Sequence, residues 1–273
     1  MEGLPTCDDP NVLALVAKND DGSATNAMEG MSRHIKEVWN NGSGQQVTVI
    51  STGPMTNIAL FVTVYGELLP AVEEFVFMGG GVGLGNRSAV AEYNILCDRE
   101  HSYCIMNSNT GVIKTSTAHA AQIVLNVPTK KTMIPINVTH TAIVTREKHI
   151  QLLRPGSEFS VDPPKALTNL RHTLSTLISF FADSYRTTFG FNDGPPLHDA
   201  LTIAYVARPE LFTTTRHRVD IELTGTHSMG ETVVDVWKYL PADDSWGRTG
   251  RNCLVADSLK VSRVHLDEVF SLH

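Results

Sequence analysis

Short apolar, β-branched segments alternate with helical segments along this chain, and this alternation constrains the fold more than any other feature. Residues 47–51 form one such segment and lead into Thr52-Gly53-Pro54, which predicts a buried strand followed by a tight loop. A helical pattern begins at Asn57. Further strands are predicted at residues 75–78, 133–138, 219–223 and 232–236.

Helical segments fill the intervals between these strands. One of them repeats apolar residues at three- and four-residue spacing: Leu170, Leu174, Leu177, Ile178, Phe181 and Tyr185. Another follows Pro195-Pro196, which suits a helix start. This alternation predicts an α/β fold with an open, mostly parallel, Rossmann-like sheet flanked by helices. We expect a single domain over residues 1–273.

In open parallel sheets, ligands bind beyond the carboxyl ends of the strands. The loops after Ser51, Met78 and Ile136 are therefore the expected places for a site. This rule does not say which chemistry the loops perform.

The composition limits the partners and the compartment. The net charge is -7 and the chain has no basic cluster, which argues against binding to nucleic acid or to anionic membranes. No apolar run reaches membrane-spanning length, and the first residues lack the pattern of a signal peptide. The cysteines form no C-x-x-C pair, which is typical of reduced thiols: Cys7, Cys97, Cys104 and Cys253. We expect a cytoplasmic protein that binds a small molecule.

A glycine-rich loop follows the strand predicted at residues 75–78. Its spacing is neither G-x-x-x-x-G-K-[ST] nor G-x-G-x-x-G, so it is not a standard phosphate loop. Asn86, Glu92 and Asn94 follow closely. A carboxylate between two amides can bind several hydroxyl groups at once, as a sugar requires. A turn that is merely polar would have a similar composition, and the residues alone do not separate the two interpretations.

His198 and Asp199 stand at a predicted helix start. Asp199 at this position can simply favour the helix dipole, with His198 incidental. The functional interpretation is a carboxylate for a metal or a substrate beside a proton donor. Taken alone, this pair favours the structural interpretation.

Three separated motifs together resemble the inosine-uridine nucleoside hydrolase family. They are residues 50–59 (I-S-T-G-P-M-T-N-I-A), residues 77–95 with the glycine loop, and residues 192–200 (N-D-G-P-P-L-H-D-A). The resemblance runs from about residue 2 to the end of the chain. It implies hydrolysis of the N-glycosidic bond of purine or pyrimidine ribonucleosides to ribose and free base. It also implies a homo-oligomer, because members of the family commonly form dimers or tetramers.

The same resemblance implies a role for each matching residue. The ribose-binding residues would be Met78, Asn86, Glu92, Asn94 and Asp199. A bound Ca²⁺ would take the Thr52 carbonyl and Asp199, and the catalytic residues would be His198, near the leaving base, and Asp199. Tyr185 or Phe189 is expected against the base.

The chemistry of glycosidic cleavage suits these residue types. The reaction builds positive charge on the ribose, which nearby carboxylates stabilise. An oxygen-ligated Ca²⁺ orients a water molecule and lowers its pKa. Among the site residues, His198 has the ordinary pKa best suited to supply a proton near neutral pH.

Two segments depart from the family pattern. The family begins with a strand that ends in D-x-D-x-x-x-D-D, and its aspartates supply most metal ligands and the base that activates water. This sequence has no such motif; its nearest acidic pairs are Asp8-Asp9 and Asp20-Asp21. We expect an N-terminally truncated domain that lacks the first strand or strands, has an incomplete Ca²⁺ site and hydrolyses little. Residues 99–119 are expected to be an insertion, either a surface loop or a translated intron.

Two alternatives come from other functional classes. A catalytically impaired remnant would bind ribose or nucleosides through Asn86, Glu92 and Asn94 without activating water, and it would not respond to calcium. A Rossmann-type dehydrogenase would need a G-x-G-x-x-G loop after a strand, which the glycine loop does not provide.

Overall fold

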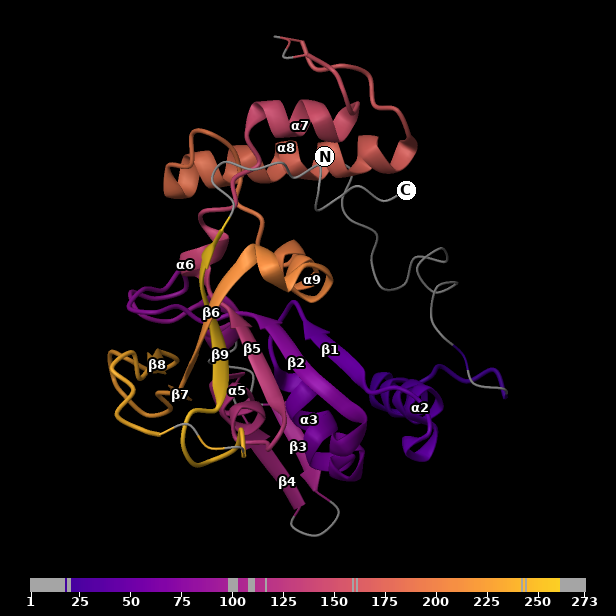
Figure 1. Ribbon diagram of the computed structural model, residues 1–273, viewed down its shortest axis with the longest axis vertical. Coiled ribbons are helices and arrows are strands. Elements are labelled where there is room, and N and C mark those ends of the chain that lie inside the picture. Colours follow the sequence, from indigo (N-terminus) through magenta and orange to yellow (C-terminus); the bar gives the residue numbers. More distant parts are fainter. Residues whose placement is uncertain are drawn as a thin grey trace.

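A five-stranded sheet forms the centre of the protein in the computed structural model, which describes residues 18, 21–97, 103–107, 111–115, 117–158, 160, 162–241, 243 and 245–260 (Figure 1). The strand order is β1 (Val47–Ser51), β2 (Val72–Met78), β5 (Lys130–Ile134), β9 (Cys253–Leu259) and β6 (Phe212–His217). Neighbouring strands are parallel except β6, which pairs with β9 in the antiparallel direction. The predicted open, mostly parallel sheet is confirmed.

Successive residues of β2 point to opposite faces of the sheet, and each face has its own apolar core. Phe75 and Phe77 belong to a core formed with α2 (Ala27–Trp39), α3 (Thr56–Val64) and α5 (Thr117–Leu125). Val76 belongs to a second core on the opposite face, formed with α9 (Ala200–Ala207). Because both faces are covered, β2 is buried at every residue except Glu73, as is usual for a central parallel strand.

The remaining helices lie beyond the carboxyl ends of the parallel strands or join elements of the fold. The first group comprises α4 (Tyr93–Leu96), α6 (Ile136–Thr139), α7 (Arg146–Leu153) and α8 (Asn169–Phe189). Figure 1 shows α7 and α8 side by side at the top of the molecule. The described residues also form short 3₁₀ helices: η1 (Asn40–Gly42), η2 (Gly66–Ala71) and η3 (Pro209–Leu211).

The predicted helix that contains Leu170 and Tyr185 is α8, but its apolar stripe is not a core face. It begins after the N-cap Thr168 and ends at Gly190, whose φ of 76° is typical of a glycine C-cap. No residue of α8 is buried, and Leu170 and Leu177 are 68% and 49% exposed. Part of the stripe instead lines the cavity described below.

Three predicted segments differ from the structure. The strand predicted at residues 133–138 ends at Ile134, because Pro135 cannot donate to a ladder and begins α6 instead. The segments predicted at 219–223 and 232–236 form β7 (Val219–Ile221) and β8 (Thr232–Val234), which pair with each other in a separate antiparallel ribbon.

The expected insertion at residues 99–119 includes an antiparallel hairpin. Its strands are β3 (Tyr103–Asn107) and β4 (Gly111–Thr115), and Figure 1 shows them at the end of the molecule opposite α7 and α8.

Asp8, Asp9 and Asp20 lie outside the described residues. Within the described part of the chain, no helix has the length and apolar character needed to cross a membrane.

Candidate active site

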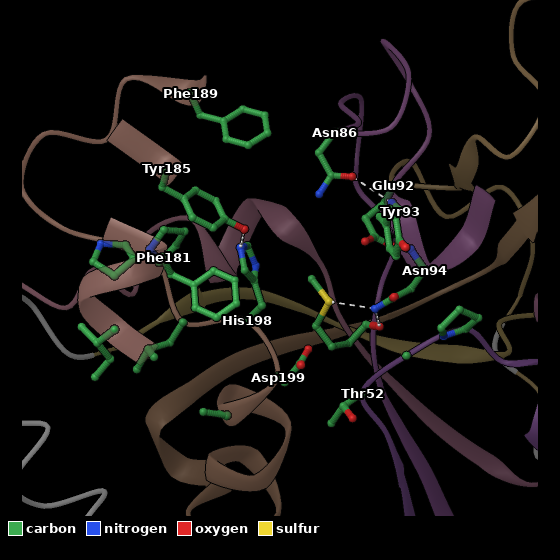
Figure 2. A pocket seen from close by; sticks show the side chains of 18 residues that line it. Thr52, Asn86, Glu92, Tyr93, Asn94, Phe181, Tyr185, Phe189, His198 and Asp199 are labelled. Carbon is green, nitrogen blue, oxygen red and sulfur yellow. Dashed lines mark hydrogen bonds between the residues drawn. The ribbon is translucent and has the colours of Figure 1, made fainter. Parts of the chain in front are cut away.

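A cavity of about 680 Å³ lies where the carboxyl ends of β1 and β2 meet α8 and the start of α9. All seven predicted site residues line it: Thr52, Met78, Asn86, Glu92, Asn94, His198 and Asp199. Figure 2 shows Asn86, Glu92 and Asn94 on one wall and the rings of Phe181, Tyr185 and Phe189 on the opposite wall. The cavity therefore has a polar wall and an aromatic wall.

Glu92 and Asn94 are fixed by backbone hydrogen bonds on the polar wall. Glu92 is the N-cap of α4 and 2% exposed, and its Oε2 accepts from Asn94 N at 2.9 Å and from Gly80 N at 3.0 Å. The Asn94 amide Nδ2 donates to the Met78 carbonyl at 3.0 Å. Burial raises the pKa of Glu92, although these backbone donors partly oppose the shift. Both side chains are held in place before any ligand binds.

Asn86 lies at the rim of the same wall. Its Oδ1 accepts from Tyr93 N at 2.8 Å, which closes the loop between the glycine segment and α4. The loop is tight: a Cβ at Gly85 would lie 2.4 Å from the backbone N and O of Ala91, so only glycine fits there. The exposed amide of Asn86 thereby stays beside the cavity.

Asp199 and Thr52 lie at one end of the cavity, between the two walls (Figure 2). Asp199 is the N-cap of α9, but its side chain makes no capping bond. Thr202 instead donates its hydroxyl to the Asp199 carbonyl at 2.6 Å. Burial raises the pKa of the Asp199 carboxyl. The carboxyl group is not used for capping, which leaves it to a ligand.

His198 is bonded at both ring nitrogens. Its Nδ1 lies 2.7 Å from the Thr139 hydroxyl oxygen, and its Nε2 lies 2.7 Å from the Tyr185 phenol oxygen. Burial, with a smaller contribution from His140, lowers the pKa of His198 to about 4. The sequence interpretation gave His198 an ordinary pKa suited to supplying a proton near neutral pH; with its pKa lowered to about 4, the partly buried ring is neutral there.

The aromatic wall was only partly foreseen. Tyr185 or Phe189 was expected near the base, and both line the cavity with ring centroids 5.4 Å apart. Phe181 and Ile178 also line it, although the sequence placed them only on the apolar face of a helix. Burial, with smaller contributions from Asp199 and Glu92, raises the pKa of Tyr185. A sequence pattern marks the apolar face of a helix, but not whether that face meets a core or a cavity.

The described residues do not form a complete calcium site. Of the residues that the resemblance assigns to the metal, Thr52 and Asp199 line the cavity, whereas Ca²⁺ takes about six to eight oxygens. In the part of the chain that the structure describes, no three side chains of His, Cys, Asp or Glu are grouped to hold a metal. Asp21 lies in this part, but its carboxylate accepts from Ser23.

Comparison with known proteins decides the family. Residues 2–265 match the profile of the inosine-uridine preferring nucleoside hydrolases. The chain belongs to this family. A probable ribonucleoside hydrolase of Dictyostelium discoideum is 35% identical to this chain over 212 residues, which are 77% of this chain and 55% of the relative. The pyrimidine-specific ribonucleoside hydrolase RihA of Salmonella newport is 34% identical over 212 residues, or 77% of this chain and 57% of the relative.

Solved structures share the fold of this chain. A purine-preferring ribonucleoside hydrolase from Gardnerella vaginalis superposes with a TM-score of 0.66 at 24% identity, covering 93% of this chain and 67% of that structure. A plant nucleoside hydrolase gives a TM-score of 0.63 at 23% identity, over 89% and 64%. The chain spans little more than half the length of the two curated relatives above.

Proposed function

We propose that this protein binds ribonucleosides in the cavity between β1, β2 and α8 and hydrolyses their N-glycosidic bond to ribose and free base. The observation that carries the proposal is that one cavity gathers all seven residues that match the family's site. Its two walls differ in chemistry as the two halves of a nucleoside do. The role of each residue is argued below from its contacts.

The polar wall would bind the ribose. Ribose offers several hydroxyl groups, each of which donates and accepts hydrogen bonds. Glu92 supplies an acceptor and the Asn86 amide supplies donors, with Asn94 and Met78 beside them at the cavity surface. Because backbone bonds already fix Glu92 and Asn94, little side-chain entropy would be lost on binding.

Two carboxyl groups would stabilise the charge that develops during cleavage. The sugar gains oxocarbenium character as the bond to the base breaks. Asp199 and Glu92 both line the cavity, and negative charge near the ring lowers the barrier. The burial that raises the pKa of Glu92 also strengthens its interaction with a cation in the site, whereas Asp199 is more exposed.

The aromatic wall would hold the base. Phe181, Tyr185 and Phe189 present ring faces and edges to the cavity, and a flat heterocycle stacks on such surfaces. The bonded pair of Tyr185 and His198 would form hydrogen bonds with the base. Both purine and pyrimidine bases suit this wall, in line with the purine-preferring and pyrimidine-specific names of the relatives.

Calcium would bind only with ligands beyond the two at the cavity. The Thr52 carbonyl and Asp199 would contribute, and the remaining oxygens would come from residues outside the described part of the chain or from water. This shortfall favours a second candidate function, in which the chain binds nucleosides and hydrolyses them slowly or not at all. We place either function in cytoplasmic nucleoside catabolism, in a protein that self-associates.

Ribose release from uridine and from inosine tests the proposal, measured with added Ca²⁺ and with a chelator. Release that the chelator and Asp199→Asn both abolish supports hydrolysis. Folded protein that binds both nucleosides without releasing ribose supports the second candidate. Folded protein that neither binds nor cleaves them contradicts both.

A further inference from the structure

Thr139 lies behind His198 and outside the cavity lining. It is the last residue of α6, it is fully buried, and its hydroxyl oxygen is 2.7 Å from His198 Nδ1. On the other side of the ring, His198 Nε2 meets the Tyr185 hydroxyl, and both His198 and Tyr185 do line the cavity. Any influence of Thr139 on a ligand would therefore pass through His198.

Thr139, His198 and Tyr185 form a series of hydrogen bonds, and the proton positions in this series follow from counting donors and acceptors. A neutral imidazole has one N–H and one bare nitrogen, so His198 donates on one side and accepts on the other. The Thr139 hydroxyl also lies 3.4 Å from the Ile136 carbonyl oxygen, which can only accept. If the Thr139 proton points to that carbonyl, the Thr139 oxygen is free to accept from Nδ1.

The hydrogen bond between Tyr185 and His198, at the other end of this series, favours the same proton positions. A phenol is a better donor than an aliphatic hydroxyl, so Tyr185 donates to a bare Nε2 more readily than Thr139 donates to a bare Nδ1. In this arrangement Tyr185 donates to Nε2, Nδ1–H donates to Thr139, and Thr139 donates to Ile136. Every proton in the series then has an acceptor. The reverse direction leaves the Tyr185 proton without an acceptor among these residues and the bond from Thr139 to Ile136 unmade, although the Ile136 carbonyl still accepts from His140 N.

We propose that Thr139 is a positioning residue, which holds His198 as the Nδ1–H tautomer and keeps Nε2 bare toward Tyr185. As a consequence, the Tyr185 hydroxyl donates its proton in a hydrogen bond to His198, and the phenol oxygen presents a lone pair to a ligand in the cavity. The importance of this for catalysis rests on the proposed function. The tautomer itself does not, so it can be tested in a protein that proves inactive.

The test is the ¹⁵N spectrum of the His198 ring at neutral pH, with the signal assigned by its loss in His198→Gln. Wild-type protein is expected to carry the proton on Nδ1. Thr139→Val keeps the shape of the side chain but removes the acceptor, and it is expected to move the proton to Nε2. Thr139→Ser keeps a hydroxyl and is expected to restore the wild-type pattern.

Tyr185→Phe separates the two neighbours of the ring. It removes the Nε2 partner and leaves Thr139 in place, so His198 is expected to remain the Nδ1–H tautomer. A wild-type spectrum with the proton on Nε2 would overturn the assignment. An unchanged spectrum in Thr139→Val would also overturn it, because Thr139 would then not set the tautomer. If Thr139→Val does not fold, the wild-type, Thr139→Ser and Tyr185→Phe spectra still decide.

Nucleoside affinity gives a second, functional readout. In Thr139→Val we expect uridine to bind roughly tenfold more weakly. The reason is that the Tyr185 hydroxyl no longer has a bare His198 Nε2 to which it can donate. Thr139→Ser is expected to bind within about twofold of wild type. Weak binding by both variants would assign Thr139 a packing role only and contradict the proposal. Failure of wild-type protein to bind uridine would count against the proposed function, while the tautomer test would stand.

Discussion

The Tyr185 phenol oxygen lies 2.7 Å from Nε2 of His198, so one hydrogen bond joins α8 to the residue that precedes the N-cap of α9. It connects two elements that otherwise frame the cavity from different sides (Figure 2). Because no residue of α8 is buried, the position of its aromatic wall depends on a few such contacts. The first prediction concerns this bond.

Tyr185→Phe should weaken nucleoside binding by roughly tenfold, in line with the loss of one hydrogen bond to a buried partner. The ring remains, so stacking on the aromatic wall should persist. Titration calorimetry with uridine and inosine measures the change. Tyr239→Phe is the control, because Tyr239 is 85% exposed and does not line the cavity. Equal affinity of Tyr185→Phe and wild type would show that the hydroxyl has no part in binding.

Asn94→Ala should reduce nucleoside affinity by about tenfold or more and destabilise the fold by about 1 kcal/mol. Its amide bonds the Met78 carbonyl, which would be left without this donor. Affinity is measured by calorimetry and stability by urea unfolding. Asn169→Ala, at the exposed start of α8, should change neither quantity. A stability loss with unchanged affinity would make Asn94 purely structural.

Gly85→Ala should disturb the loop that carries Asn86. The added Cβ would lie 2.4 Å from Ala91 backbone atoms, which cannot move aside as a side chain does. We expect a loss of about 2 kcal/mol in the free energy of unfolding and weaker nucleoside binding. Gly66→Ala is the control, since nothing lies within 4 Å of its Cβ position. Wild-type behaviour of Gly85→Ala would contradict the close approach.

Lys131 gives a prediction about pH. Its buried ammonium donates to the carbonyls of Val127, Thr129 and Trp246 at 2.6–2.7 Å, and burial lowers its pKa to about 7 from 10.5. Between these values the unfolded chain holds the proton and the folded protein does not. The free energy of unfolding should therefore rise with pH above about 7, by up to about 1.4 kcal/mol per unit from this residue.

Lys131→Met should lack this contribution, so its stability curve should climb less steeply than that of wild type between pH 7 and pH 9. Urea unfolding at each pH measures both curves, with the exposed Lys165→Met as the control. Parallel curves for wild type and Lys131→Met would mean that the ammonium keeps its proton and all three carbonyl bonds across this range.

The sequence predicted the polar wall well because its parts are local. Glu92 and Asn94 are two residues apart in one cap, and they follow a strand whose end the glycines mark. The His198 environment was not predictable in the same way. Thr139 and Tyr185 reach it from α6 and α8, at 59 and 13 residues' distance, and neither the buried neutral ring nor its lowered pKa has a local signature.

In the fold, too, elements with a local sequence pattern were predicted, and those that depend on long-range pairing were not. Residues 47–51 were predicted as a strand because all five suit one, whereas β6 and β9 were missed. β6 is an edge strand whose inner residues are mostly half-buried, and its threonines also suit a loop. Its pairing with β9 joins segments about forty residues apart, which no local pattern records. The apolar residues on both sides of Pro135 predicted one strand over 133–138, but the strand ends before Pro135.

The most direct test of the central claim is equilibrium binding of uridine and inosine to the purified, folded chain, with free ribose as competitor. Binding does not require the metal ligands that hydrolysis needs. We predict one saturable site per chain, with a dissociation constant at or below about 1 mM, which ribose competes for and Glu92→Gln weakens. Folded protein that binds neither nucleoside, or binds them with Glu92→Gln unchanged, would contradict the assignment of this cavity.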